Sequence, residues 1–124
     1  MRALTLLKMS EQVGQPPESL FQAMDETIKE IEKTVTIIDT NGLVPTAEAA
    51  TKIRVTGGKT TVLDGPFAES RELVGGYAIV EVDTYQQAVD ASRKIIEVHE
   101  KYWPGWEGEA EVRQIMGPDE LPGG

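Results

Sequence analysis

The sequence contains no cysteine and only one histidine. Without a thiol there can be no disulfide bond, no thiolate catalysis and no cysteine-based zinc site. A metal site built on the single histidine would have to take all its other ligands from carboxylates. The composition therefore predicts no bound metal, and the lack of cysteine fits a cytoplasmic location.

Long hydrophobic runs are missing as well. A membrane span needs about 20 consecutive apolar residues, whereas the apolar run at the amino terminus is interrupted by Lys8. The same run is too short for the apolar part of a signal peptide. We therefore expect no membrane partner, and we interpret residues 2–9 as a strand.

Positive charge is scarce, with 12 lysines and arginines against 21 aspartates and glutamates and a formal net charge of −9. Nucleic-acid binding depends on clustered basic side chains, so nucleic acid is not an expected partner. Phosphate loops, dinucleotide-binding patterns and nucleophile elbows are absent too. Nucleotide hydrolysis, hydride transfer, serine hydrolase activity and any cofactor are therefore not expected.

What the chain does contain is the composition of one globular domain. It has 124 residues, of which 40% are hydrophobic and 27% charged. That length suits one domain and is too short for two of ordinary size. We expect a single domain over residues 1–116 and a flexible tail over residues 117–124.

Hydrophobic periodicity predicts a long first helix after the first strand. Proline is tolerated in the first turn of a helix, so the helix begins near Pro17, and Asn41-Gly42 is a typical helix end. Apolar residues spaced by three or four positions form its buried stripe, namely Leu20, Met24, Ile28, Ile31, Val35 and Ile38.

The second half of the chain predicts a hairpin, a strand, a helix and a last strand. Two β-rich runs, 52–56 and 59–63, flank Gly57-Gly58, which is a hairpin pattern. After a loop over 64–76, residues 77–82 form a strand. Thr84 opens a helix with a capping box, Pro104 prevents its continuation, and 109–116 form the last strand.

The expected order is therefore β-α-β-β-β-α-β, an α+β domain in which two helices cover one face of a sheet. The other face would expose apolar side chains, which soluble monomers avoid. We expect a homodimer through that face.

A resemblance to a known family rests on an Asp-Gly-Pro-Phe-Ala-Glu core, residues 64–69, followed by Gly75-Gly76-Tyr77. This pattern resembles the signature of DGPF proteins, a branch of the YCII-related family. Leu43-Val44-Pro45, Gln87-Ala88 and Glu111-Val112-Arg113 support it. The resemblance implies a ferredoxin-like fold that pairs into a dimeric α+β barrel with one cleft per subunit. Some relatives use an early histidine with an aspartate, and this chain has no histidine there.

The signature loop allows two interpretations. Asp64 is either the first residue of a tight turn or a carboxylate that handles protons in the cleft, and Phe67 fills the core or lines the cleft. Glu69 and Arg71 are either solvated charges or ligand contacts, with Arg71 able to grip a substrate carboxylate.

Outside the loop, His99 is either a structural histidine or a catalytic partner of Asp64. Trp103 covers a core edge or forms one wall of a pocket. On the last strand, Arg113 shares a face with Glu111. The plain explanation of that pair is cross-strand pairing with basic residues of the hairpin, Lys52 or Arg54, and the alternative is ligand contact.

Two functions follow from these residues. The first is binding of a small molecule in a cleft of a dimeric α+β barrel, with possible general acid–base catalysis by Asp64 and His99 and an anionic substrate oriented by Arg71 or Arg113. The second is a non-catalytic dimeric interaction or regulatory module. The sequence leaves open whether the protein is an enzyme.

Overall fold

A computed structural model describes residues 1–11, 14–67 and 73–120 of the protein. In these residues it contains two α-helices and six strands. The helices are α1 (Glu18–Ile31) and α2 (Tyr85–Tyr102), and a short 3-10 helix, η2, spans Pro118–Glu120. The strands are β1 (Arg2–Met9), β2 (Thr36–Gly42), β3 (Thr51–Thr56), β4 (Lys59–Asp64), β5 (Leu73–Glu81) and β6 (Gly108–Gln114).

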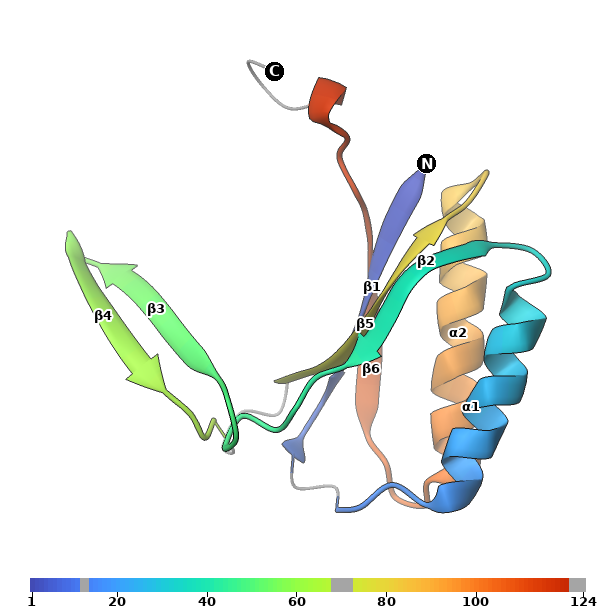
Figure 1. Ribbon diagram of the computed structural model, residues 1–124, viewed down its shortest axis with the longest axis horizontal. Helices are drawn as coiled ribbons and strands as arrows, with labels where there is room; N and C mark the ends of the chain where they lie inside the picture. The colour runs from blue at the N-terminus through green and yellow to red at the C-terminus, as the bar shows by residue number, and fades with distance from the viewer. Residues whose placement is uncertain (12–13, 68–72, 121–124) are drawn as a thin grey trace.

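Four strands form an antiparallel sheet in the order β2-β5-β1-β6, and both helices cover the same face of it (Figure 1). The predicted α+β class is therefore confirmed, and the strand order is compatible with a ferredoxin-like fold. Strands β3 and β4 form a separate two-stranded sheet between β2 and β5 in the chain. We call this hairpin, Thr51–Asp64, the arm.

Alternation along β1 divides its side chains between the two faces of the sheet. Ala3 is fully buried under the helices, and Thr5 contacts Ser92 of α2. The intervening residues point to the face opposite the helices, which we call the open face. With their partners on β5 and β6, the open face includes Leu4, Leu6, Tyr77, Ile79, Glu111 and Arg113.

The core lies between the sheet and the helices. Its buried cluster joins residues from both layers, Ala3, Ile31, Val35, Val80, Val82 and Ala88. Small residues at positions such as Ala3 and Ala88 allow helix α2 to lie close to the sheet. The core therefore explains why both helices share one face.

The predicted capping box of α2 is confirmed. The backbone amide of Gln87 donates to Oγ1 of Thr84 (3.4 Å), and the amide of Thr84 donates to Oε1 of Gln87 (3.1 Å). The two residues thus satisfy amides that the first helical turn leaves without partners.

The predicted first helix is too long. Helix α1 ends at Ile31, and Thr36–Gly42 form β2 instead of its last turns, so Asn41-Gly42 end a strand. The reason is a run of β-branched residues, 34–38, that lose side-chain freedom in a helix and fit well on a pleated strand. Pairing of β2 with β5 then provides the backbone hydrogen bonds.

Strand β5 is longer than the 77–82 segment predicted for it. It begins at Leu73, inside the segment expected to be a loop, because Leu73 and Val74 pair with Met9 and Lys8 of β1. The element order is therefore β-α-β-β-β-β-α-β. The Gly57-Gly58 hairpin is confirmed, but it stands apart from the main sheet.

Candidate functional site

A cavity of about 210 Å³ lies between the two helices and the four-stranded sheet. Its walls are mainly apolar, and both layers contribute to them. Residues of the helices and strands that line it include Leu7, Met24, Ile28, Ile37, Ala91 and Ile95. Cavities with apolar walls and a few polar groups are the usual form of small-molecule sites.

Two hydroxyl groups line the cavity where β1 meets α2. The hydroxyl of Ser92 donates to the backbone carbonyl of Ala88 (2.8 Å). Oγ1 of Thr5 lies 2.8 Å from the same serine oxygen. Because the serine hydrogen is already used, Thr5 is the donor of this second bond. Both hydroxyls therefore offer only acceptor lone pairs to the cavity.

His99 lines the cavity from the last turns of α2 and is only 5% exposed. Its Nδ1 lies 2.8 Å from the carbonyl oxygen of Ile95. Since a carbonyl can only accept, Nδ1 carries the hydrogen and Nε2 keeps a lone pair. Burial lowers the pKa of His99 below its ordinary 6.5, partly opposed by the bond to Ile95. The ring is therefore a neutral hydrogen-bond acceptor near neutral pH.

Two tryptophans contact the histidine, one through its backbone amide and the other through its ring. Trp103, 8% exposed, ends α2 and donates its backbone amide to the carbonyl of His99 (3.0 Å). The ring of Trp106 lies 4.8 Å from the His99 ring, tilted by 42°. Gly108 makes room for that indole, because a Cβ there would overlap the Trp106 ring and approach the Lys8 carbonyl oxygen at 2.6 Å. Both tryptophans therefore contact the histidine at the carboxyl end of α2.

The buried histidine predicts a loss of stability below neutral pH. The unfolded chain binds a proton at the ordinary pKa of 6.5, while the folded His99 remains neutral to lower pH. Stability therefore falls as the pH drops below about 6.5, by at most about 1.4 kcal/mol per pH unit for one proton. Urea unfolding between about pH 8 and pH 5 measures this slope.

The matched control is His99→Phe, which keeps a ring against Trp106 but cannot titrate. Its stability should stay level between about pH 6.5 and pH 5. Glu30 and Glu111 have pKa values lowered by their lysine partners, Lys33 and Lys8, so their effects fall at more acidic pH. An equal slope in both proteins would show that His99 is not the group responsible.

Asp64 and Phe67 lie at the base of the arm. Asp64 Oδ1 accepts a hydrogen bond from the Thr51 hydroxyl (3.1 Å). The backbone amide of Phe67 donates to Oγ1 of Thr46 (2.8 Å), and Lys52 Nζ lies 4.3 Å from the centre of the Phe67 ring. These contacts join the signature turn to its neighbouring loop.

Thr46 is itself fixed by the segment after β1. Its amide and its hydroxyl donate to the two carboxylate oxygens of Glu11, at 2.6 Å and 2.8 Å. The hydrogen bonds from Glu11 through Thr46 to Phe67 therefore connect three loops. Glu69 and Arg71 of the same signature lie outside the described residues.

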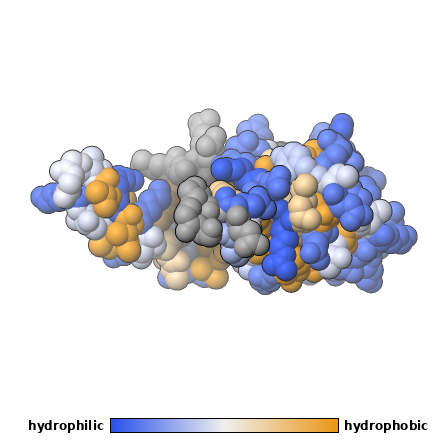
Figure 2. Space-filling model, turned by 90° about the horizontal axis from the view of Figure 1, so that it is seen from above, coloured by the Kyte–Doolittle hydropathy of each residue, from blue (hydrophilic) through white to orange (hydrophobic). Residues whose placement is uncertain are grey.

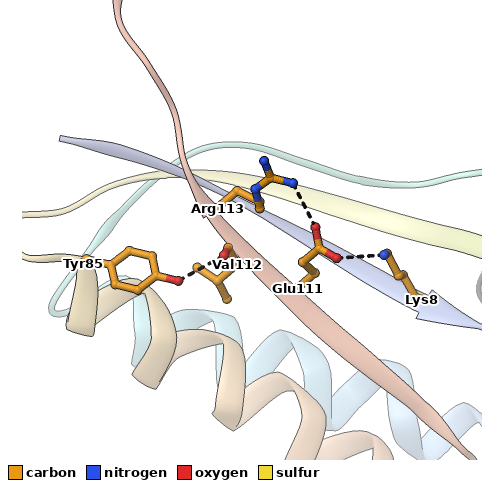
Figure 3. A network of polar contacts seen from close by, with 5 residues as sticks. All are labelled: Lys8, Tyr85, Glu111, Val112 and Arg113. Atoms are coloured by element: carbon orange, nitrogen blue, oxygen red, sulfur yellow. Dashed lines mark hydrogen bonds and ion pairs between the residues drawn. The ribbon is translucent and has the colours of Figure 1, made fainter. Parts of the chain in front are cut away.

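Arg113 lies on the open face, where it takes part in an ion network (Figure 3). Glu111 accepts hydrogen bonds from Lys8 Nζ (2.8 Å) and from Arg113 Nη1 (3.4 Å). Pairing of this strand with Lys52 or Arg54 was expected and is wrong, because β6 pairs with β1 and the arm forms another sheet. On the helix side, the Tyr85 hydroxyl donates to the Val112 carbonyl (3.0 Å).

The structure thus separates the two residues expected to share protons. Asp64 ends β4 in the arm, whereas His99 lines the cavity under α2, and no contact joins them among the described residues. Thr5 and Ser92, which sequence reasoning did not select, line the same cavity as His99, as do the polar residues Thr40, Asn41 and Tyr77. In the sequence, Thr5 and Ser92 each stand out as a hydroxyl side chain at a position where the periodicity of the strand or helix predicts an apolar residue.

The described part of the chain shows neither a metal-binding cluster nor a membrane-spanning helix. No group of three His, Cys, Asp or Glu side chains there is arranged to hold a metal ion. Neither described helix combines the length and the apolar character needed to cross a membrane.

Comparison with known proteins relates this chain to a protein family. A protein of Rhizobium meliloti (strain 1021), named only as uncharacterised, is 37% identical over 82 residues. The match covers 64% of this chain and 61% of that relative, so this chain spans less than two thirds of its length. The family model of the YCII-related domain matches residues 1–115. The chain therefore belongs to the YCII-related family, as its signature loop predicted.

Proposed function

We propose that this protein binds a small, largely apolar molecule that carries a hydrogen-bond donor, in the cavity between the helices and the sheet. One observation supports the proposal above all. The side-chain groups of Thr5, Ser92 and His99 that line the cavity have their hydrogens engaged elsewhere and offer lone pairs.

Buried acceptors select for a ligand with a donor. A ligand that leaves such a group without a hydrogen-bond partner binds more weakly, because removing that group from water without replacing its hydrogen bond costs about 1–3 kcal/mol for each group. A carboxylate ligand would place its own lone pairs against those of the protein, in a chain of net charge −9. Alcohols, phenols and amines of modest size are therefore the favoured ligands.

His99 is the group best suited to proton chemistry at this site. A neutral imidazole beside a bound donor accepts its hydrogen bond, and a sufficiently acidic ligand passes it the proton. The role of general base at this site thus falls to His99, because Asp64 is not among the described residues that line the cavity.

Phenol and toluene provide a test, because they have similar shapes and differ in one hydroxyl group. We expect phenol to bind more tightly to the wild-type protein. In His99→Phe the preference for phenol over toluene should fall by roughly 2- to 13-fold, the value of one neutral hydrogen bond. Isothermal titration calorimetry on both proteins measures it.

Two further results make this test decisive. Toluene affinity should change little between the two proteins, since the variant keeps the apolar walls and an aromatic ring. An unchanged phenol preference in His99→Phe would remove the histidine from the site. If neither compound binds the wild-type protein, the cavity is not a ligand site.

We also propose that a second copy covers the open face, which would complete the dimeric α+β barrel expected from the sequence. Half-buried aliphatic side chains, Leu4, Leu6 and Ile79, occupy the middle of that face. The network of Lys8, Glu111 and Arg113 described above lies beside them. An apolar centre with a polar rim is the usual composition of a protein interface.

A further inference from the structure

The arm exposes an apolar face that nothing in the described chain covers. Register and alternation place Ile53, Val55 and Val62 on one side of the hairpin, with Ile53 directly opposite Val62. Their exposed fractions are 72%, 70% and 65%. A two-stranded hairpin is at best marginally stable in water unless it packs on something else.

The arm also differs in charge from the remainder of the molecule. Residues 51–64 contain three basic side chains, Lys52, Arg54 and Lys59, and one acidic side chain, Asp64. The arm therefore has a formal net charge of +2. The remaining residues have a formal net charge of −11, and the two add up to the −9 of the whole chain. A basic arm on an acidic chain is electrostatically complementary to another copy of the same chain.

The position of the arm suits such a partner. It extends from the edge of the main sheet on the side away from both helices (Figure 1). Figure 2 shows apolar side chains at the surface of this end of the molecule. A second copy seated on the open face would lie next to the arm.

We infer that the arm is a clasp for a second copy of this chain. Its apolar side packs on the partner, and its basic side chains draw the arm toward the acidic surface of that partner. In a symmetric pair each arm holds the other subunit, so the contact occurs twice. Contact through the open face alone would not need the arm.

The first experiment removes the apolar face without changing charge. The triple variant Ile53→Thr, Val55→Thr and Val62→Thr keeps β-branched residues suited to strands. Sedimentation velocity across the micromolar range should show a dimer dissociation constant raised by about 100-fold or more. The control, Ile53→Val with Val55→Ile and Val62→Ile, keeps the apolar face and should remain a dimer.

The second experiment tests the charge. Lys52→Glu with Arg54→Glu should weaken the dimer by about 10-fold or more, because it turns attraction into repulsion. The control, Lys29→Glu with Lys94→Glu, changes the net charge by the same amount at exposed positions of α1 and α2. It should weaken the dimer less than the arm variant does.

The outcomes separate the clasp from the other proposals. A wild-type monomer, or a threonine variant that dimerises as tightly as the wild type, would overturn the clasp. A threonine variant that is monomeric, with an unchanged thermal unfolding midpoint, would support it. Phenol binding measured on the same variants reports on the cavity independently, since no arm residue lines it in the described structure.

Discussion

Ala91→Leu is expected to weaken phenol binding by about 10-fold or more while the protein stays fully folded. Ala91 lies on α2, lines the cavity and packs against the buried core cluster. A leucine there occupies the space that a ligand would need, and it is an excellent helix former. Filling an apolar cavity adds contacts, so stability should be unchanged or higher by up to about 2 kcal/mol.

Lys94→Leu serves as the control, because it places the same side chain on an exposed position of the same helix. It should leave phenol affinity unchanged. Calorimetry for binding and urea unfolding for stability distinguish the two effects in each variant. Wild-type affinity in Ala91→Leu would mean that phenol binds somewhere other than this cavity.

Gly65→Ala is expected to destabilise the protein by about 3 kcal/mol or more, lowering the unfolding midpoint by about 10 °C or more. The added Cβ would overlap the carbonyl oxygen of Thr46 and lie 2.9 Å from its carbonyl carbon. Thr46 cannot move away freely, because Glu11 accepts two hydrogen bonds from it and Phe67 donates another to it. The glycine of the signature thus permits a close approach of two backbones.

Gly42→Ala is the matched control for this substitution. Gly42 ends β2, and the nearest atom to an added Cβ would be the Gly75 carbonyl oxygen at an ordinary 3.9 Å. Its unfolding midpoint should fall by only a few degrees, the effect of an exposed strand position. If Gly65→Ala were tolerated equally well, the Thr46 contact would not hold this turn in place.

Several elements of the fold were predictable because their signals are local. Strand β1, the Gly57-Gly58 hairpin and the capping box of α2 all follow from residues close together in the chain. Strand β2 was missed because its local signals compete. Val35 and Ile38 continue the spacing of a helix stripe, whereas the β-branched run 34–38 favours a strand, and pairing with β5 decides between them.

The candidate site was predictable in part for the same reason. His99 stands out as the single histidine on the apolar side of a predicted helix. Its neighbours come from other elements, with Thr5 on β1 and Trp106 after α2. Asp64, the expected partner of His99, lies in the arm, so the neighbours of His99 within this chain could not be identified from the sequence.

The sequence by itself determined the α+β class, the single histidine, the acidic charge and the family, since these depend on residue identity and short-range pattern. Only the tertiary structure shows that the hydrogens of Thr5, Ser92 and His99 are already engaged in hydrogen bonds. These three groups therefore offer lone pairs to the cavity. The tertiary structure also decided that the arm leaves the main sheet with an apolar side exposed. The physical reason is that strand pairing and burial are set by contacts between distant segments, and alternation within one segment does not identify its neighbours.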